Sequence, residues 1–157
     1  MTNDGSIYDS DYFLRGKQTG KSLYEDYRWM PELTVPMVCA MVSHLRIDPD
    51  DTILDFGCAR GYVVRALREN GYNAYGYDVS SWAIDNCDPS VKDYLWGVSS
   101  WKHIGSRMCY DWIIAKDVLE HIRDLDTTVD ALKCVRKGIF AVVPLAHGEE
   151  YDVPEYE

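Results

Sequence analysis

Two acidic residues and two glycines in the middle of the chain have the types and spacing of a ligand site. Asp55 precedes Gly57 by two positions, and Gly61 follows Gly57 with three residues between them. Glycine at such positions allows a tight turn with a left-handed backbone. Asp78 follows 17 residues after Gly61, and a carboxylate there can accept both hydroxyls of a ribose. These residues together predict a nucleoside-binding site.

The glycine spacing separates this site from a dinucleotide site. A dinucleotide-binding loop reads Gly-x-Gly-x-x-Gly, a pattern that Gly57 and Gly61 do not follow. Asp55 would be repelled by a pyrophosphate, because both groups are anionic. A ligand that carries an amino group and a sulfonium would suit this carboxylate better. The motif therefore disfavours a dinucleotide oxidoreductase, which stays open as one alternative among nucleotide-binding α/β proteins.

Short apolar runs alternate with helical periodicity around these residues. Wholly apolar short strands are typical of parallel strands that are buried on both faces. We therefore expect an α/β fold, a Rossmann-like doubly wound sheet that is mainly parallel and has about five strands. The expected strands cover residues 52–56, 73–78, 93–97, 111–116 and 138–144, and the expected helices cover residues 34–44, 62–70, 81–87 and 126–136.

The first thirty residues differ in composition from the rest of the chain. They are rich in tyrosine and in charged residues, and such aromatic side chains usually need a surface to cover. We expect residues 1–32 to form an ordered N-terminal extension or lid with short helical turns, and residues 33–157 to form the Rossmann domain. Thr34 has the type of a helix N-cap, with Pro36 in the first turn of the helix that follows.

Charge and composition exclude several classes of function. The chain has 157 residues, 16 Lys and Arg, and 26 Asp and Glu, which gives a formal net charge of −10. This balance argues against partners that are nucleic acids or anionic membranes. The five cysteines contain no Cys-x-x-Cys pair and the four histidines show no metal-ligand spacing, so we expect no disulfide framework and no metal site. A reducing, cytoplasmic location fits this cysteine usage.

Three segments resemble those of class I S-adenosylmethionine-dependent methyltransferases. Residues 55–61, Asp-Phe-Gly-Cys-Ala-Arg-Gly, resemble the first motif, D-x-G-C-G-x-G, with Ala59 in place of the middle glycine. We expect this alanine to tighten the turn without abolishing it. Residues 77–80 resemble the second motif, and residues 111–122 resemble the D-x-I-x-x-x-x-V-L-E-H-I segment of small-molecule and glycan methyltransferases. The resemblance spans residues 50–146 and implies S-adenosylmethionine as the cofactor.

The resemblance also implies roles for individual residues. The loop with Gly57 and Gly61 would hold the methionine part of the cofactor, and Asp78 would hold the ribose. His121 and Glu120 would be the catalytic residues, with His121 available as a general base. The remaining cofactor contacts would come from Asp55, Cys58, Ala59, Val79, Ser99 and Asp117.

The N-terminal extension has two expected roles. It packs over the domain as a lid, or it contacts the cofactor carboxylate through Tyr12, Arg15 or Tyr24. Both roles fit aromatic and cationic side chains on a short segment.

These observations predict a methyltransferase that acts on a small-molecule or sugar-like acceptor. One alternative is a cofactor-binding domain without transferase activity, because its acceptor half is incomplete. Members of the resembled family continue through two more strands, so we expect this chain to lack the last two. The fifth strand would then be an edge, which a homodimer or the C-terminal tail, folded back, could cover.

Overall fold

The computed structural model describes residues 5–99, 109–122, 124–133 and 135–144. Its strands are β1 (Thr52–Phe56), β2 (Asn73–Asp78), β3 (Leu95–Gly97), β4 (Trp112–Lys116) and β5 (Gly138–Val142). Its α-helices are α1 (Ser10–Leu14), α2 (Gly16–Thr19), α3 (Pro31–Leu45), α4 (Tyr62–Glu69), α5 (Ser81–Asp85) and α6 (Leu125–Leu132). Short 3₁₀-helices are η1 (Gly5–Ile7), η2 (Pro89–Tyr94) and η4 (Leu119–His121).

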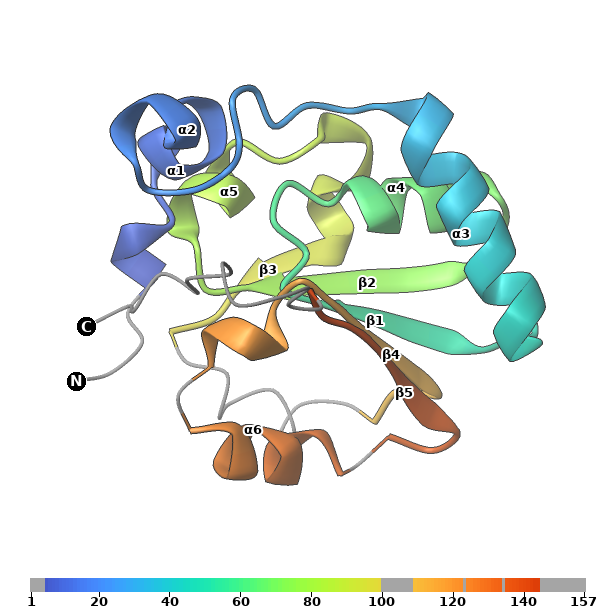
Figure 1. The fold of residues 1–157 in the computed structure, drawn as a ribbon. Helices are drawn as coiled ribbons and strands as arrows, with labels where there is room; N and C mark the ends of the chain where they lie inside the picture. The colour runs from blue at the N-terminus through green and yellow to red at the C-terminus, as the bar shows by residue number, and fades with distance from the viewer. Residues whose placement is uncertain (1–4, 100–108, 123, 134, 145–157) are drawn as a thin grey trace.

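The five strands form one parallel sheet in the order β3-β2-β1-β4-β5. Helices α3, α4 and α5 lie on one face of the sheet and α6 lies on the other (Figure 1). Parallel neighbours require a crossover between strands, and the helices supply it. The expected α/β, Rossmann-like fold with about five strands is therefore confirmed.

Alternate residues of β1 supply the two halves of the core. Ile53 packs with Val38 of α3 and Val64 of α4, whereas Leu54 packs with Leu132 of α6 on the opposite face. This alternation follows from the two-residue period of a strand. Asp55 has the same parity as Ile53, so it faces the α3 and α4 side at the carboxyl end of β1.

The start of α3 differs from the expectation. We predicted Thr34 as the N-cap, but the helix begins at Pro31, and the Thr34 amide donates to the Met30 carbonyl at 2.9 Å. Proline at the first helical position has a backbone angle that is already suited to a helix. Pro36 therefore lies inside the helix and not in its first turn.

Several other elements are shorter than expected, among them the helix predicted to residue 87, which ends at Asp85, and the strand predicted to residue 144, which ends at Val142. The strand predicted from residue 93 begins at Leu95, because Asp88 caps the preceding η2 by accepting from the Ser90 amide at 3.0 Å. The helix predicted to residue 136 ends at Leu132. The cap predicted at Ser80 or Ser81 is at Ser80, whose hydroxyl accepts from the Ala83 amide at 3.0 Å.

Residues 5–30, hereafter the N-terminal segment, pack on α5 and the loop before it. The Phe13 ring stacks on Trp82 at a centroid distance of 5.4 Å, and the Ser80 hydroxyl donates to the Tyr8 carbonyl at 2.5 Å. Short helices form in this segment, as its composition predicts. The segment thereby lies next to the carboxyl ends of the strands (Figure 1).

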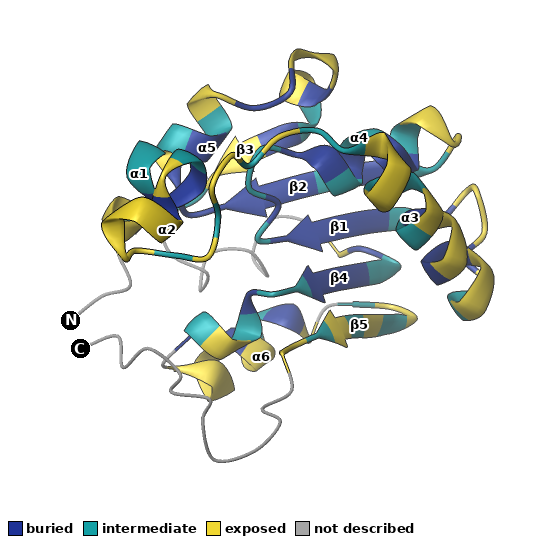
Figure 2. Ribbon diagram, turned by 45° about the horizontal axis from the view of Figure 1, so that its top comes forward, coloured by how far each residue is buried: buried dark blue, intermediate teal, exposed yellow. Residues whose placement is uncertain are grey.

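Strand β5 is the edge of the sheet in the part of the chain that the structure describes (Figure 2). Ile139 on this strand and Val143 just after it are more than a third exposed. Within the described residues β5 is therefore at the edge, as expected, while the C-terminal tail, which is expected to fold back over it, lies outside the described residues. Among the described helices, none combines the length and apolar character that a membrane span requires.

Candidate functional site

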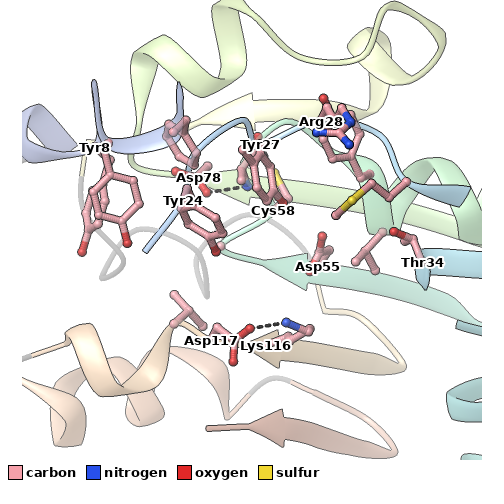
Figure 3. A pocket seen from close by; sticks show the side chains of 18 of the residues that line it. Tyr8, Tyr24, Tyr27, Arg28, Thr34, Asp55, Cys58, Asp78, Lys116 and Asp117 are labelled. Carbon is pink, nitrogen blue, oxygen red and sulfur yellow. Dashed lines mark hydrogen bonds and ion pairs between the residues drawn. The ribbon is translucent and has the colours of Figure 1, made fainter. Parts of the chain in front are cut away.

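A cavity of about 620 Å³ lies at the carboxyl ends of β1, β2 and β4. In open α/β sheets this is the edge where ligands bind. The core contributes residues from the loops after these strands, and the N-terminal segment contributes a second wall (Figure 3). The predicted site residues that line the cavity are Asp55, Gly57, Cys58, Ala59, Asp78, Val79, Asp117 and His121.

Three residues of the loop after β1 have left-handed backbone angles. Gly57, Ala59 and Gly61 have φ values of +83°, +47° and +81°. A Cβ atom on Gly57 would lie 2.7 Å from a methyl group of Val118, and one on Gly61 would lie 2.5 Å from a methyl group of Leu95. These glycines are therefore required by the turn and by protein packing. Gly61 itself does not line the cavity.

Ala59 takes the left-handed conformation in place of the glycine of the resembled motif. Its amide donates to Asp78 Oδ2 at 2.7 Å, and this bond joins the loop after β1 to the end of β2. A left-handed conformation costs a residue with a Cβ atom about 1–2 kcal/mol. The turn is kept, as expected, but at an energetic cost.

Ala59→Gly is expected to raise the free energy of unfolding by about 0.5 kcal/mol. Relief of the left-handed conformation, about 1–2 kcal/mol, outweighs the added freedom of the unfolded chain, about 0.4–1 kcal/mol. The matched control is Ala131→Gly inside α6, which should lower the free energy of unfolding by about 1 kcal/mol. Urea unfolding measures both. Equal losses in the two variants would contradict the strain at Ala59.

Two buried carboxyl groups face the cavity. Burial raises the pKa of Asp78 to about 6, although backbone amides of Ser80 and Ala59 act in the opposite direction. Burial, and then the nearby charge of Asp78, raise the pKa of Asp55 to about 7, while Lys116 acts in the opposite direction. A cationic ligand with hydroxyl donors would stabilise the ionised form of both groups.

The loop after β4 closes the opposite side of the cavity. Asp117 has φ +54°, forms an ion pair with Lys116, and its amide donates to the Val142 carbonyl at 2.8 Å. Across the cavity from this pair lies the Tyr24 side chain (Figure 3). Burial, and then the charges of Asp117 and Glu120, raise the pKa of Tyr24, so its hydroxyl stays protonated near neutral pH.

The two predicted catalytic residues have different positions. His121 lines the cavity, and its ring meets the Tyr8 ring edge to face with centroids 6.3 Å apart. Glu120 does not line the cavity, and its carboxylate lies 3.9 Å from His121 Nε2. Ser99, predicted at the adenine edge, is exposed beyond the end of β3 and lies outside the cavity lining.

Several lining residues are not predicted from the sequence, among them Tyr27, Arg28 and Lys116. Of the three side chains expected to approach a cofactor carboxylate, Tyr12 and Tyr24 line the cavity. Arg15 does not, because α1 directs it to an ion pair with Asp11 on the surface. The aromatic composition of the N-terminal segment was the available signal for this wall of the cavity. It does not identify which positively charged side chain of the segment faces the cavity.

The sequence of this chain matches a known protein family. A family profile described as a methyltransferase domain matches residues 36–143, which includes the loops after β1, β2 and β4. No curated protein matches the chain significantly.

Solved structures with the same fold are distant in sequence. The magnesium protoporphyrin IX methyltransferase ChlM from Synechocystis PCC 6803, with bound S-adenosylmethionine, is 18% identical with a TM-score of 0.57, and the match covers 84% of this chain and 71% of that one. The MccD protein is 16% identical with a TM-score of 0.53 and coverages of 62% and 47%. The [4+2]-cyclase SpnF is 16% identical with a TM-score of 0.56 and coverages of 73% and 48%. The chain therefore matches about half the length of MccD and SpnF.

Proposed function

This chain belongs to the methyltransferase domain family, and from that premise we propose that it transfers a methyl group from S-adenosylmethionine to a small-molecule or sugar-like acceptor. The observation that carries the proposal is the pair of buried carboxyl groups, Asp55 and Asp78, beside the cavity. Their raised pKa values are the expected property of a site built for a positively charged, hydroxyl-bearing ligand.

The cavity residues fit this cofactor. Asp78 would accept the ribose hydroxyls, and Val79, which follows it, would pack on the adenine. Asp55 would face the positive charge of the methionine part, which the backbone of Gly57, Cys58 and Ala59 would hold. When bound, the cofactor supplies a methyl group on a positively charged sulfur, which a nucleophilic acceptor can attack.

The chain's own residues would orient the acceptor and handle its proton. Asp117 lies at the carboxyl end of β4, where we propose that the acceptor meets the methyl group. His121 would accept a proton from the acceptor, and Glu120, close to the His121 ring, would orient that ring. Tyrosines 8, 12, 24 and 27 would exclude water from the reaction.

Calorimetric titration with S-adenosylmethionine and S-adenosylhomocysteine, with NAD and ATP as controls, tests the cofactor assignment. We expect micromolar binding of the first two and none of the controls. Binding of NAD or ATP instead would support another nucleotide-binding α/β protein. Because the same fold occurs in a [4+2]-cyclase, release of S-adenosylhomocysteine must also be measured with hydroxyl- and amine-bearing acceptors. Binding without transfer to any of them would favour the cofactor-binding domain without transferase activity.

His121→Gln separates catalysis from cofactor binding. We expect a lower rate of methyl transfer and an unchanged affinity for S-adenosylhomocysteine, because the His121 ring acts on the acceptor in this proposal. Equal losses of rate and affinity would assign His121 to the cofactor site instead.

The cysteines and the β5 edge are the features from which we propose a location and an assembly. Cys39, Cys58, Cys87 and Cys109 are free thiols, which is the reason to propose a reducing, cytoplasmic location. A homodimer that covers the β5 edge stays a prediction, and sedimentation at several protein concentrations measures it.

A further inference from the structure

Arg60 connects four parts of the molecule from within the loop that would hold the cofactor. Its Nη1 donates to the Tyr27 carbonyl at 3.0 Å, and its Nε donates to the Asn86 carbonyl at 2.7 Å. Its guanidinium lies 5.6 Å from the centre of the Tyr62 ring. The Arg60 carbonyl accepts from the Asp88 amide at 2.9 Å. The side chain therefore ties the N-terminal segment to the loop after β1 and to the end of α5.

The bond to Tyr27 holds the part of the N-terminal segment that faces the cavity. Tyr24, Tyr27 and Arg28 all line it. The Tyr27 ring packs on the rings of Tyr24 and Tyr62 at centroid distances of 4.9 Å and 5.3 Å. The Arg60 guanidinium is thus attached to the backbone at the centre of this wall.

A second attachment holds the other end of the N-terminal segment. The Ser80 hydroxyl donates to the Tyr8 carbonyl at 2.5 Å, and the Ser80 amide donates to Asp78 Oδ1 at 2.7 Å. Asp78 Oδ2 in turn accepts from Ala59, the neighbour of Arg60. One attachment therefore starts from Ser80, which donates to this carboxylate, and the other starts from Arg60, the residue next to Ala59, which also donates to it. In the proposed function this carboxylate binds the ribose.

We propose that Arg60 is a positioning residue that fastens the N-terminal segment over the cofactor, so that binding at Asp78 and closure of this segment stabilise each other. The inference rests on the proposed function, because it takes S-adenosylmethionine as the ligand under the segment. Arg60 does not line the cavity and acts through the backbone of Tyr27.

Arg60→Ala tests this role against Arg68→Ala as the matched control. The Arg68 guanidinium also donates to a backbone carbonyl, that of Ala74 at 2.9 Å, and lies over a tyrosine ring, that of Tyr94. Neither contact reaches the cavity or the N-terminal segment. A general loss of stability would thus appear in both variants. Loss of the attachment between the N-terminal segment and the loop after β1 would appear in Arg60→Ala alone.

We expect Arg60→Ala to raise the dissociation rate constant of S-adenosylhomocysteine about tenfold, in line with one lost hydrogen bond to a charged group. Arg68→Ala should leave this rate constant unchanged. Arg60→Lys, which keeps the charge but not the planar pair of donors, should fall between Arg60→Ala and the wild type. Equal dissociation rate constants in Arg60→Ala and Arg68→Ala would overturn the proposal.

Hydrogen exchange of residues 24–30 gives a readout that does not depend on the cofactor. Without ligand, Arg60→Ala should accelerate exchange in these residues, and exchange in β1 and β4 should not change. If the wild type bound no S-adenosylhomocysteine, the proposed function would fail, and this measurement would still decide whether Arg60 fastens the segment. Unchanged exchange in residues 24–30 would overturn the proposal in either case.

Discussion

Asp78→Asn is expected to weaken binding of S-adenosylhomocysteine at least a hundredfold at pH 8. Each hydrogen bond from a ribose hydroxyl to the carboxylate contributes about 1.5–3 kcal/mol, and two such bonds correspond to a factor of a hundred or more. Asparagine keeps the size of the side chain but has one acceptor oxygen, whereas the Ala59 and Ser80 amides donate to different oxygens of Asp78. A loss of stability is therefore expected here, as in the control variant, and calorimetry on the folded protein measures the lost affinity.

Asp111→Asn is the matched control for this variant. Asp111 Oδ2 accepts from the Thr52 amide at 2.9 Å and from the Thr52 hydroxyl at 2.7 Å. This carboxylate holds two donors on one oxygen, whereas Asp78 holds one on each oxygen, and it lies at the amino ends of the strands, outside the cavity lining. We expect Asp111→Asn to lower the free energy of unfolding and to leave the affinity for S-adenosylhomocysteine unchanged. An affinity of Asp78→Asn within tenfold of the wild type would remove Asp78 from the ribose site.

The central part of the fold is predictable because local and global preferences agree there. Strand β1 is mostly apolar, its neighbours in sequence are helical, and Gly57 and Gly61 mark the turn that joins it to α4. Strand β3 is less predictable, because residues 93 and 94, which also suit a strand, belong to the 3₁₀-helix η2. The start of α3 depends on Pro31, whose preference for a first turn outweighs the capping preference of Thr34.

The site residues at the ends of strands are predictable from the sequence, whereas those that reach the cavity through tertiary contacts are not. Asp55 and Asp78 end neighbouring strands, so topology alone brings them to one cavity. Tyr27 and Arg28 reach that cavity because the N-terminal segment folds back over the core, which no local pattern specifies. Glu120 and His121 belong to the same sequence motif and lie next to each other on the 3₁₀-helix η4. Neighbouring residues of such a helix point in different directions, and only His121 lines the cavity.

Lowering the pH from 8 to 5 is expected to weaken binding of S-adenosylhomocysteine at least a hundredfold. In the ligand-free protein the pKa of Asp55 is raised to about 7 and that of Asp78 to about 6. Burial raises the pKa of Tyr27 and of Cys58 well above their usual values, so these neighbours do not titrate in this range. A ligand that requires both carboxylates releases protons on binding, and its affinity rises with pH in this window.

The stability of the ligand-free protein should change with pH in the opposite direction. Both carboxyl groups have a pKa of about 4 in the unfolded chain, so the native state binds more protons between about pH 4 and pH 7. Their contribution to the free energy of unfolding is therefore largest at the acidic end of this window and is lost as the pH rises through it. Carboxylates such as Asp88, with a lowered pKa, contribute with the opposite sign at lower pH.

Comparing Asp55→Asn with the wild type isolates the contribution of Asp55 to the pH dependence of binding and of stability, because the two proteins share all other carboxyl groups. The variant should show a smaller fall in thermal stability from pH 5 to pH 8. Calorimetry in two buffers with different ionisation enthalpies, at about pH 6.5, should show proton release on binding in the wild type and less in Asp55→Asn. Equal proton release in the two proteins would mean that the positive charge of the ligand does not face Asp55. The same carboxylate that destabilises the free protein at neutral pH would then have no part in binding, and the raised pKa of Asp55 would be a cost of burial alone.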